Sequence, residues 1–294
     1  MKKLLYIAFI LTIILNSCGD LSEDIDWEVD EIPPRLIVEG MVTSEFKNHM
    51  IKLRQSGNYF SNTETPVVSG ATVEVRSGSL IYAFEESPAG SGNYISVDAF
   101  EGVPGNTYTM NIELNEPLNN EIYYTATSEL VAGFRIDSLD VEVYENPFTF
   151  EDDDSDSLVT LFIMYGQEPP SVHNYYVVNY YKNDSLITDT IDKAEVIDDE
   201  LAGIDGEELV IMYTGEPYFI GDNARIEFLS VNKEYTDFLN GINQISRGTD
   251  PFGISGPPAN AIGNIEGGDA FGFFIASDLT GGTAQIDSLS FLDY

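Results

Sequence analysis

This chain of 294 residues has few cysteine and histidine side chains that could serve as a nucleophile and its base, one cysteine and two histidines, whereas its aspartates and glutamates number 50. A nucleophile and its base must be neighbours in space, but His49 and His173 fall in different predicted domains. The motifs Gly-x-Ser-x-Gly, His-Glu-x-x-His and Gly-x-x-x-x-Gly-Lys are absent. Paired carboxylates can hydrolyse glycosides, but so many acids single out no pair. We therefore expect no enzyme activity, no catalytic residue and no cofactor.

The acidic segment 151–156 superficially resembles a calcium loop, because Asp152, Asp154 and Asp156 occupy alternate positions. The glycine and the final glutamate that an EF-hand loop requires are missing. A highly charged segment with little to bury is typical of a solvated loop. We favour that interpretation over a specific calcium site, and we predict no metal site.

Cys18, the only cysteine, follows a short apolar segment. Lys2 and Lys3 open the chain, and residues 4–15 carry no charge. As a helix these residues would span about 18 Å, well short of a hydrocarbon core of about 30 Å. The pattern is that of a signal peptide rather than a membrane span.

The tetrapeptide Leu15-Asn16-Ser17-Cys18 resembles the lipobox of bacterial lipoproteins, whose thiol is acylated and whose signal is cut just before the cysteine. The resemblance implies a signal peptide over 1–17 and a lipidated Cys18 as the first mature residue. A thiolate is a strong nucleophile, which suits this modification. Several acyl chains together anchor a protein firmly, whereas one chain holds it only weakly.

Residues 18–34 form the predicted tether, a segment with one aromatic residue and a run of acids: Asp20, Glu23, Asp24, Asp26, Glu28, Asp30 and Glu31. Such a segment stays solvated, with a reach of about 20–24 Å. It resembles the acidic signal that Bacteroidota place behind the lipid-bearing cysteine of lipoproteins sent to the outer face of the outer membrane. We therefore expect a lipid-anchored protein on the outer membrane that faces the cell exterior.

The net charge of −37 excludes nucleic acid as a partner, because phosphate binding needs clustered Lys and Arg. Most of this charge is explained by solubility alone. An aromatic content of 12% and the near absence of long helical patterns are typical of β-rich exported proteins. The length after the tether favours two domains.

The first predicted domain, 35–131, consists of short strands at regular spacing. In "ATVEVRSG", Ala71, Val73 and Val75 share one face, which is the alternation of a half-buried strand. The same alternation recurs in "YTMNIEL". Seven or so strands within about 100 residues match an immunoglobulin-like β-sandwich.

The second predicted domain, 132–294, is also rich in strands, from "FRIDSLDVEVYE" to "AFGFFIAS" and a closing "TAQIDSLSF". One helix is predicted over 233–246, with Asn232 as its cap and an apolar stripe that packs on a sheet: Tyr235, Phe238, Leu239, Ile242 and Ile245. A Pro/Gly-rich loop follows over 247–269. A long loop of this kind within a domain is usually functional or a linker.

The order of these segments resembles a large uncharacterised family of Bacteroidota surface lipoproteins, classed as a domain of unknown function. The resemblance covers nearly the whole mature chain, and its most specific part is a run in and after the loop: Pro251, Phe252, Pro257, Pro258, Ala259, Asn260, Asn264, Ile265, Gly267, Gly268, Phe271 and Gly272. Loop length at 253–256 departs from the family pattern, which leaves the loop's shape open. The family brings no established catalytic residues.

Members of that family are commonly encoded beside TonB-dependent outer-membrane receptors. The resemblance therefore implies an accessory subunit that docks on such a β-barrel receptor and helps to capture or admit substrate. The predicted partner contacts are Pro251, Phe252, Pro257, Pro258, Asn260, Asn264 and Phe271. Two alternatives stay open: a structural component of another outer-membrane assembly or secretion complex, and a free-standing glycan- or ligand-binding lipoprotein. The sequence also leaves open whether the loop is a contact surface or an internal brace.

Overall fold

The computed structural model describes residues 33–57, 65–145, 158–169, 173–190, 193–202, 208–246 and 261–290. The predicted signal peptide, Cys18, nearly all of the tether and the acidic segment 151–156 lie outside these residues. Residues 33–294 form one compact unit. Within the described ranges, no helix is both long enough and apolar enough to span a membrane.

Seven antiparallel strands form the first part of the large sheet, in the order β1-β2-β5-β4-β3-β6-β7. They are β1 (Leu36–Thr43), β2 (Met50–Gln55), β3 (Thr72–Ser77), β4 (Leu80–Glu86), β5 (Asn93–Ser96), β6 (Thr107–Leu118) and β7 (Glu121–Glu129). The predicted alternation is confirmed, because Val73, Val75, Met110 and Ile112 are all buried in a shared core. Side chains that alternate with a period of two are the pattern of a β-strand with one buried face, which is why these strands could be predicted.

The described residues after β7 add nine strands and two helices. They are β8 (Arg135–Glu145), β9 (Leu158–Gln167), β10 (Tyr175–Lys182), β11 (Ser185–Leu186), β12 (Glu195–Asp198), α2 (Asp199–Ala202), β13 (Glu208–Tyr213), β14 (Asn223–Val231), α3 (Lys233–Ser246), β15 (Phe271–Gln285) and β16 (Leu289–Ser290). Strands β13-β9-β8-β16 make a separate sheet. Strands β11, β10, β14 and β15 extend the large sheet beyond β1, and β12 pairs with β10. The fold is therefore mainly β with a sandwich-like arrangement, as predicted.

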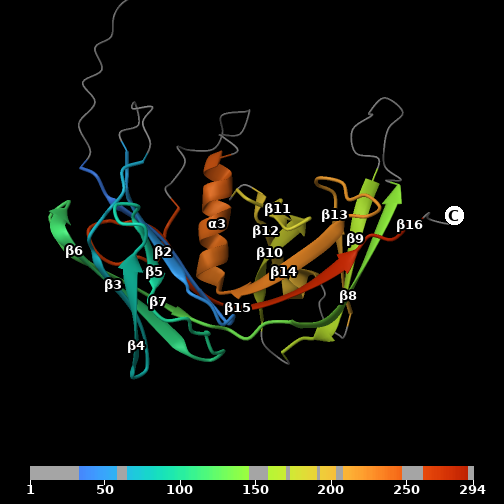
Figure 1. The fold of residues 1–294 in the computed structure, drawn as a ribbon, viewed down its shortest axis with the longest axis horizontal. Helices are drawn as coiled ribbons and strands as arrows, with labels where there is room; N and C mark the ends of the chain where they lie inside the picture. The colour runs from blue at the N-terminus through green and yellow to red at the C-terminus, as the bar shows by residue number, and fades with distance from the viewer. Residues whose placement is uncertain are drawn as a thin grey trace, which may run out of the picture. The chain divides into compact units, whose positions relative to one another are not determined.

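Strand β15 belongs to both parts of the large sheet. Its first half pairs in parallel with β1, from Ile37↔Phe271 to Thr43↔Ser277. Its second half pairs antiparallel with β14, up to Asn223↔Gln285, and Figure 1 shows the two strands side by side. The prediction of a separate closing strand, "TAQIDSLSF", is thus partly wrong, because its first residues belong to β15. Strand β15 of the predicted second domain therefore joins the sheet of the first domain. The predicted domain boundary at 131 and the immunoglobulin type of the first domain stay predictions.

The start of β15 lies unusually close to β1. Gly272 has a φ of +97°, and a Cβ at this position would lie 1.9 Å from the carbonyl oxygen of Val38. Only glycine combines this backbone conformation with such a close approach. Alternate residues on either side then face different cores, so that Phe274 and Ala276 join the first core while Phe273 and Ile275 face α3.

Helix α3 spans Lys233–Ser246, which confirms the predicted helix. Asn232 caps it, because its Oδ1 accepts a hydrogen bond of 2.9 Å from the backbone N–H of Tyr235. Phe238 and Leu239 are buried against the sheet, in a cluster with Val177 and Phe273. The four-residue helix α2 is too short to leave a periodic signal and was not predicted.

Candidate functional site

Most of the predicted partner-contact residues cannot be placed by this structure. Pro251, Phe252, Pro257, Pro258 and Asn260 lie outside the described residues. Asn264 and Phe271 are described, and they behave differently. Asn264 braces the fold, whereas Phe271 lines a groove.

Asn264 completes the free edge of β15. Its Oδ1 accepts the backbone N–H of Phe274 at 2.9 Å, and its Nδ2 donates to the Phe274 carbonyl at 2.8 Å. The same Nδ2 lies 3.4 Å from the Thr127 carbonyl on β7. Strand β14 pairs with β15 only from Asp278 onwards, so this amide replaces a missing strand neighbour. The described end of the Pro/Gly-rich loop is therefore an internal brace at this position.

Phe271 borders an apolar groove of about 540 Å³ between α3 and the β1–β15 pair. The Arg35 guanidinium lies over the Phe271 ring, 5.1 Å from its centroid. The other lining side chains come from β1, β2, β15 and α3, together with one loop residue: Ile37, Val38, Glu39, Met41, Met50, Lys52, Tyr235, Phe238, Ile242, Ala261, Phe273 and Ile275. An apolar groove with a few polar groups at its rim has the usual composition of a binding surface.

The side chains that line this groove are mostly uncharged. Phe273 packs against the rings of Tyr235 and Phe238, with centroid distances of 5.0 and 5.3 Å. Burial raises the pKa of Tyr235 to about 12, so this phenol is uncharged at neutral pH. Lys52 and Glu39 form an exposed ion pair of 3.2 Å at the rim. The groove can accept an apolar segment or ligand, and nothing in its lining suggests acid–base catalysis.

A second concave surface, of about 660 Å³, lies on β3, β6 and β7 and is more polar. Tyr123 is 59% exposed there, and its hydroxyl donates a hydrogen bond of 3.1 Å to Glu113. Glu74, Arg76 and Asn111 line the same surface. An exposed ring beside fixed polar groups can stack on a sugar and bind its hydroxyls.

The two histidines occupy contrasting sites. His49 is buried, and its Nε2 lies 2.9 Å from the Phe100 carbonyl oxygen while its Nδ1 lies 3.5 Å from the backbone N–H of Thr43. A carbonyl only accepts and an N–H only donates, so Nε2 carries the single ring proton. Burial lowers the pKa of His49 below its ordinary value. His49 is therefore a neutral structural residue.

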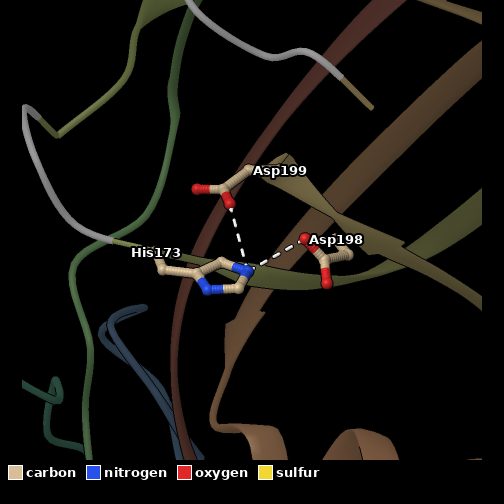
Figure 2. Close-up of side chains that lie close together, drawn as sticks. All are labelled: His173, Asp198 and Asp199. Carbon is tan, nitrogen blue, oxygen red and sulfur yellow. Dashed lines mark hydrogen bonds and ion pairs between the residues drawn. The ribbon is translucent and has the colours of Figure 1, made fainter. Parts of the chain in front are cut away.

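His173 instead lies among carboxylates, just before β10. Its Nε2 is 2.9 Å from Asp198 Oδ1 and 3.6 Å from Asp199 Oδ1, and its Nδ1 is 3.7 Å from Glu200 Oε1. Figure 2 shows both aspartates directed at the same ring nitrogen. The hydrogen bond with Asp198, helped by the charge of all three carboxylates, raises the pKa of His173.

Strand pairing explains how these groups meet. Strands β10 and β12 are antiparallel, with Tyr175 opposite Asp198, so residues before β10 lie beside residues after β12. The His173 ring packs against Tyr175 at a centroid distance of 4.6 Å. The sequence analysis missed this cluster because it considered His173 only as a possible catalytic base and not as a partner of the acids at 198–200. The available signal was the acidic run Asp198-Asp199-Glu200 at the end of a strand, but the pairing register of β10 and β12 was needed to place it beside His173.

The fold defines a mainly β, sandwich-like protein. The chain belongs to the family described as Domain of unknown function (DUF4249), whose model matches residues 22–281. No curated protein that was compared matches the chain. Among solved structures, α-L-rhamnosidase from Dictyoglumus thermophilum is 13% identical with a TM-score of 0.23. That match covers 69% of this chain and only 28% of the rhamnosidase chain, and such a weak likeness carries no argument about fold or activity.

Proposed function

We propose that this protein is an outer-membrane surface lipoprotein that serves as a non-enzymatic accessory subunit of a TonB-dependent receptor, where it helps to capture or admit substrate. The observation that carries the proposal is the order of the first residues: Lys2 and Lys3, the uncharged segment 4–15, then Cys18 and the acidic tether. This order matches a lipoprotein signal in its basic start, its apolar length and the position of its thiol.

The anchor supports an accessory role on physical grounds. Acyl chains on Cys18 would confine the protein to the membrane, and this confinement raises its effective concentration near a membrane receptor. A tether with a reach of about 20–24 Å leaves the folded body free to reorient while it stays near that partner. A weak docking contact is then enough for a lasting association.

The groove beside α3 is the surface that best suits such a contact. Its floor consists of the hydrogen-bonded strands β1 and β15, and its wall is the capped helix α3. A surface built on regular elements loses little conformational entropy on binding. Phe271, one of the predicted contact residues, lines it. An apolar segment of the receptor's exposed loops is the partner that this lining fits.

Purification from the native membrane in a mild detergent tests the proposal. The wild-type protein should carry acyl chains on Cys18, visible by mass spectrometry of the intact protein, and should bring down a TonB-dependent β-barrel. Cys18→Ala should lose both the acyl chains and the barrel. Recovery of acylated wild-type protein with no barrel would contradict the accessory role, and a different barrel would point to another outer-membrane assembly.

A pair of substitutions tests the groove. Met50 lines it and is 43% exposed, so Met50→Glu introduces charge without disturbing the core. Ile81 is 58% exposed on β4 and does not line the groove, which makes Ile81→Glu the matched control. We expect Met50→Glu to lower barrel recovery by at least about tenfold, since an unpaired charge in an apolar contact costs several kcal/mol. Equal recovery of the two variants would exclude the groove as the contact.

A free-standing glycan-binding role is the second candidate, and the exposed Tyr123 on the polar concave surface favours it. This role predicts oligosaccharide binding by the purified protein without any partner. Tyr123→Ala should then weaken that binding by about fivefold or more, because stacking on an aromatic ring contributes on the order of 1 kcal/mol or more. Unchanged binding in this variant would remove the surface from consideration.

A further inference from the structure

Three potential metal ligands converge at one end of β12. The donor atoms of His173, Asp198 and Asp199 all lie within 4.8 Å of one another. Ligands at about 2.1 Å from a tetrahedral cation are about 3.4 Å apart. The 3.6 Å between His173 Nε2 and Asp199 Oδ1 is close to this spacing. The 2.9 Å to Asp198 is a hydrogen bond that would open by about 0.5 Å when a cation replaces the proton.

Asp199 supplies an independent indication of a missing ligand. Its side chain is only 6% exposed. Its Oδ2 accepts a hydrogen bond of 2.7 Å from the backbone N–H of Asn174, whereas its Oδ1 has no hydrogen-bond partner among the residues that the structure describes. That Oδ1 is the oxygen directed at the His173 ring (Figure 2). A buried carboxylate oxygen without a partner is costly, and a bound cation would satisfy it.

The charges around this point favour a cation. Three carboxylates, those of Asp198, Asp199 and Glu200, face a single imidazole. Glu168 adds a further acid, since its carboxylate is hydrogen-bonded to Asn174 and interacts with Asp199. One histidine cannot neutralise this group of acids even when it is protonated. A divalent ion would do so at the position where the oxygens already converge.

We infer that His173, Asp198 and Asp199 form a binding site for a divalent transition-metal cation. The imidazole nitrogen decides the class of ion, because Zn²⁺ and similar metals accept imidazole while Ca²⁺ and Mg²⁺ prefer oxygen ligands alone. Three protein ligands with water in the remaining position is a common arrangement for Zn²⁺. The ion would tie the chain before β10 to the end of β12. This inference does not depend on the proposed membrane role, and it departs from the sequence analysis, which predicted no metal site.

Further polar groups lie around the three ligands, as they do in known metal sites. Nε2 binds the ion only as an unprotonated nitrogen, so the ring proton must sit on Nδ1, where Glu200 Oε1 at 3.7 Å is the nearest acceptor among the described carboxylates. The Asn174 N–H fixes the orientation of the Asp199 carboxylate. The Glu200 N–H likewise donates to Asp198 Oδ1 at 3.1 Å.

Calorimetric titration of the full chain in detergent with Zn²⁺ alone tests the inference. We expect one saturable site per chain, with a Kd that rises at least tenfold in His173→Gln and in Asp199→Asn. Asp140→Asn removes an exposed acid on β8 outside the cluster and should leave the Kd unchanged. The His173 side chain is 36% exposed, so His173→Gln keeps the test interpretable even if the buried Asp199→Asn fails to fold. Far-UV circular dichroism checks the fold of each variant.

A parallel titration with Ca²⁺ separates a histidine-containing site from diffuse attraction to an acidic protein. Ca²⁺ should bind at least tenfold more weakly than Zn²⁺, and His173→Gln should leave its binding unchanged. No saturable Zn²⁺ binding to the wild type, or equal Zn²⁺ binding in His173→Gln and the wild type, would overturn the inference. Ca²⁺ binding as tight as that of Zn²⁺ would overturn it as well.

Discussion

The surroundings of His49 and of His173 show how one side chain serves two purposes in a single compact unit. Both His49 ring nitrogens have backbone partners, Phe100 and Thr43, and the ring is 2% exposed. The His173 side chain is 36% exposed, and the described groups that lie within 4 Å of its nitrogens as ion-pair partners are carboxylates. Where every hydrogen-bonding group is satisfied by the fold, the residue contributes to stability. Where charged groups converge and a buried oxygen lacks a partner, a ligand completes the arrangement.

The same distinction separates the described parts of the predicted contact segment. Asn264 is satisfied within the molecule by Phe274 and Thr127. Phe271 is only half-buried and borders the groove. A residue that stands out in a sequence motif can therefore hold the fold together rather than contact a partner. The two roles are distinguished by whether the side chain makes its contacts within the molecule or faces a surface that a partner could reach.

Replacing the buried histidine should have the largest effect. His49→Ala leaves the Thr43 N–H without its side-chain partner, takes one of two hydrogen bonds from the Phe100 carbonyl, which keeps the bond from the Lys47 N–H, and removes the edge-to-face contact with Phe100, whose ring centroid is 4.5 Å away. We expect the free energy of unfolding to fall by about 2–4 kcal/mol. His173→Ala, at an exposed position, should have a much smaller effect on the free energy of unfolding. Urea denaturation of the two variants measures the difference. Similar losses of stability in both would contradict the distinction between a structural His49 and an exposed His173.

Replacing Asn264 should have an intermediate effect. Asn264→Ala removes two hydrogen bonds to the edge of β15, and we expect a loss of about 1–2 kcal/mol by urea denaturation. Ile262→Ala is the matched control, because Ile262 is in the same segment and is 87% exposed. If Asn264 were instead a partner contact, Asn264→Ala would leave stability unchanged and reduce only barrel recovery.

The effect of pH on stability should be smaller than these losses, and the two histidines should contribute to it with opposite signs. Burial lowers the pKa of His49 below 6.5, so its contribution to stability is present above pH 6.5 and is lost as the pH falls towards the lowered pKa. The hydrogen bond with Asp198 raises the pKa of His173, so its contribution is present below pH 6.5 and is lost as the pH rises through the raised pKa.

Nuclear magnetic resonance of the histidine ring protons resolves both titrations in one sample. One midpoint should lie above 6.5 and the other below it. Asp198→Asn should lower the higher midpoint and leave the lower one in place, because it removes the charged partner of His173 alone. Two coincident midpoints near 6.5 would show that the two sites do not differ.

Features with a local period were predictable from the sequence. The apolar stripe and the Asn232 cap predicted α3 with its observed bounds. The alternation of Val73 and Val75 predicted β3 and its buried face. In each case the residues that carry the signal are within one or two turns or a single strand, where backbone geometry sets the spacing.

Features that depend on distant pairing were not predictable. The β1–β15 register joins Ile37 to Phe271, and no local pattern encodes a parallel pairing over such a separation. The His173 cluster depends in the same way on the β10–β12 register. The role of Asn264 follows from where β14 stops pairing with β15, which is a property of the assembled sheet.

The most direct test of the contrast is a long-range ¹H–¹⁵N spectrum of the full chain, labelled at histidine, with and without one equivalent of Zn²⁺. We expect the Nε2 resonance of His173 to shift on addition of the metal, while both nitrogens of His49 keep their positions. An unchanged His173 Nε2 resonance, or equal shifts at both histidines, would contradict a metal site at His173.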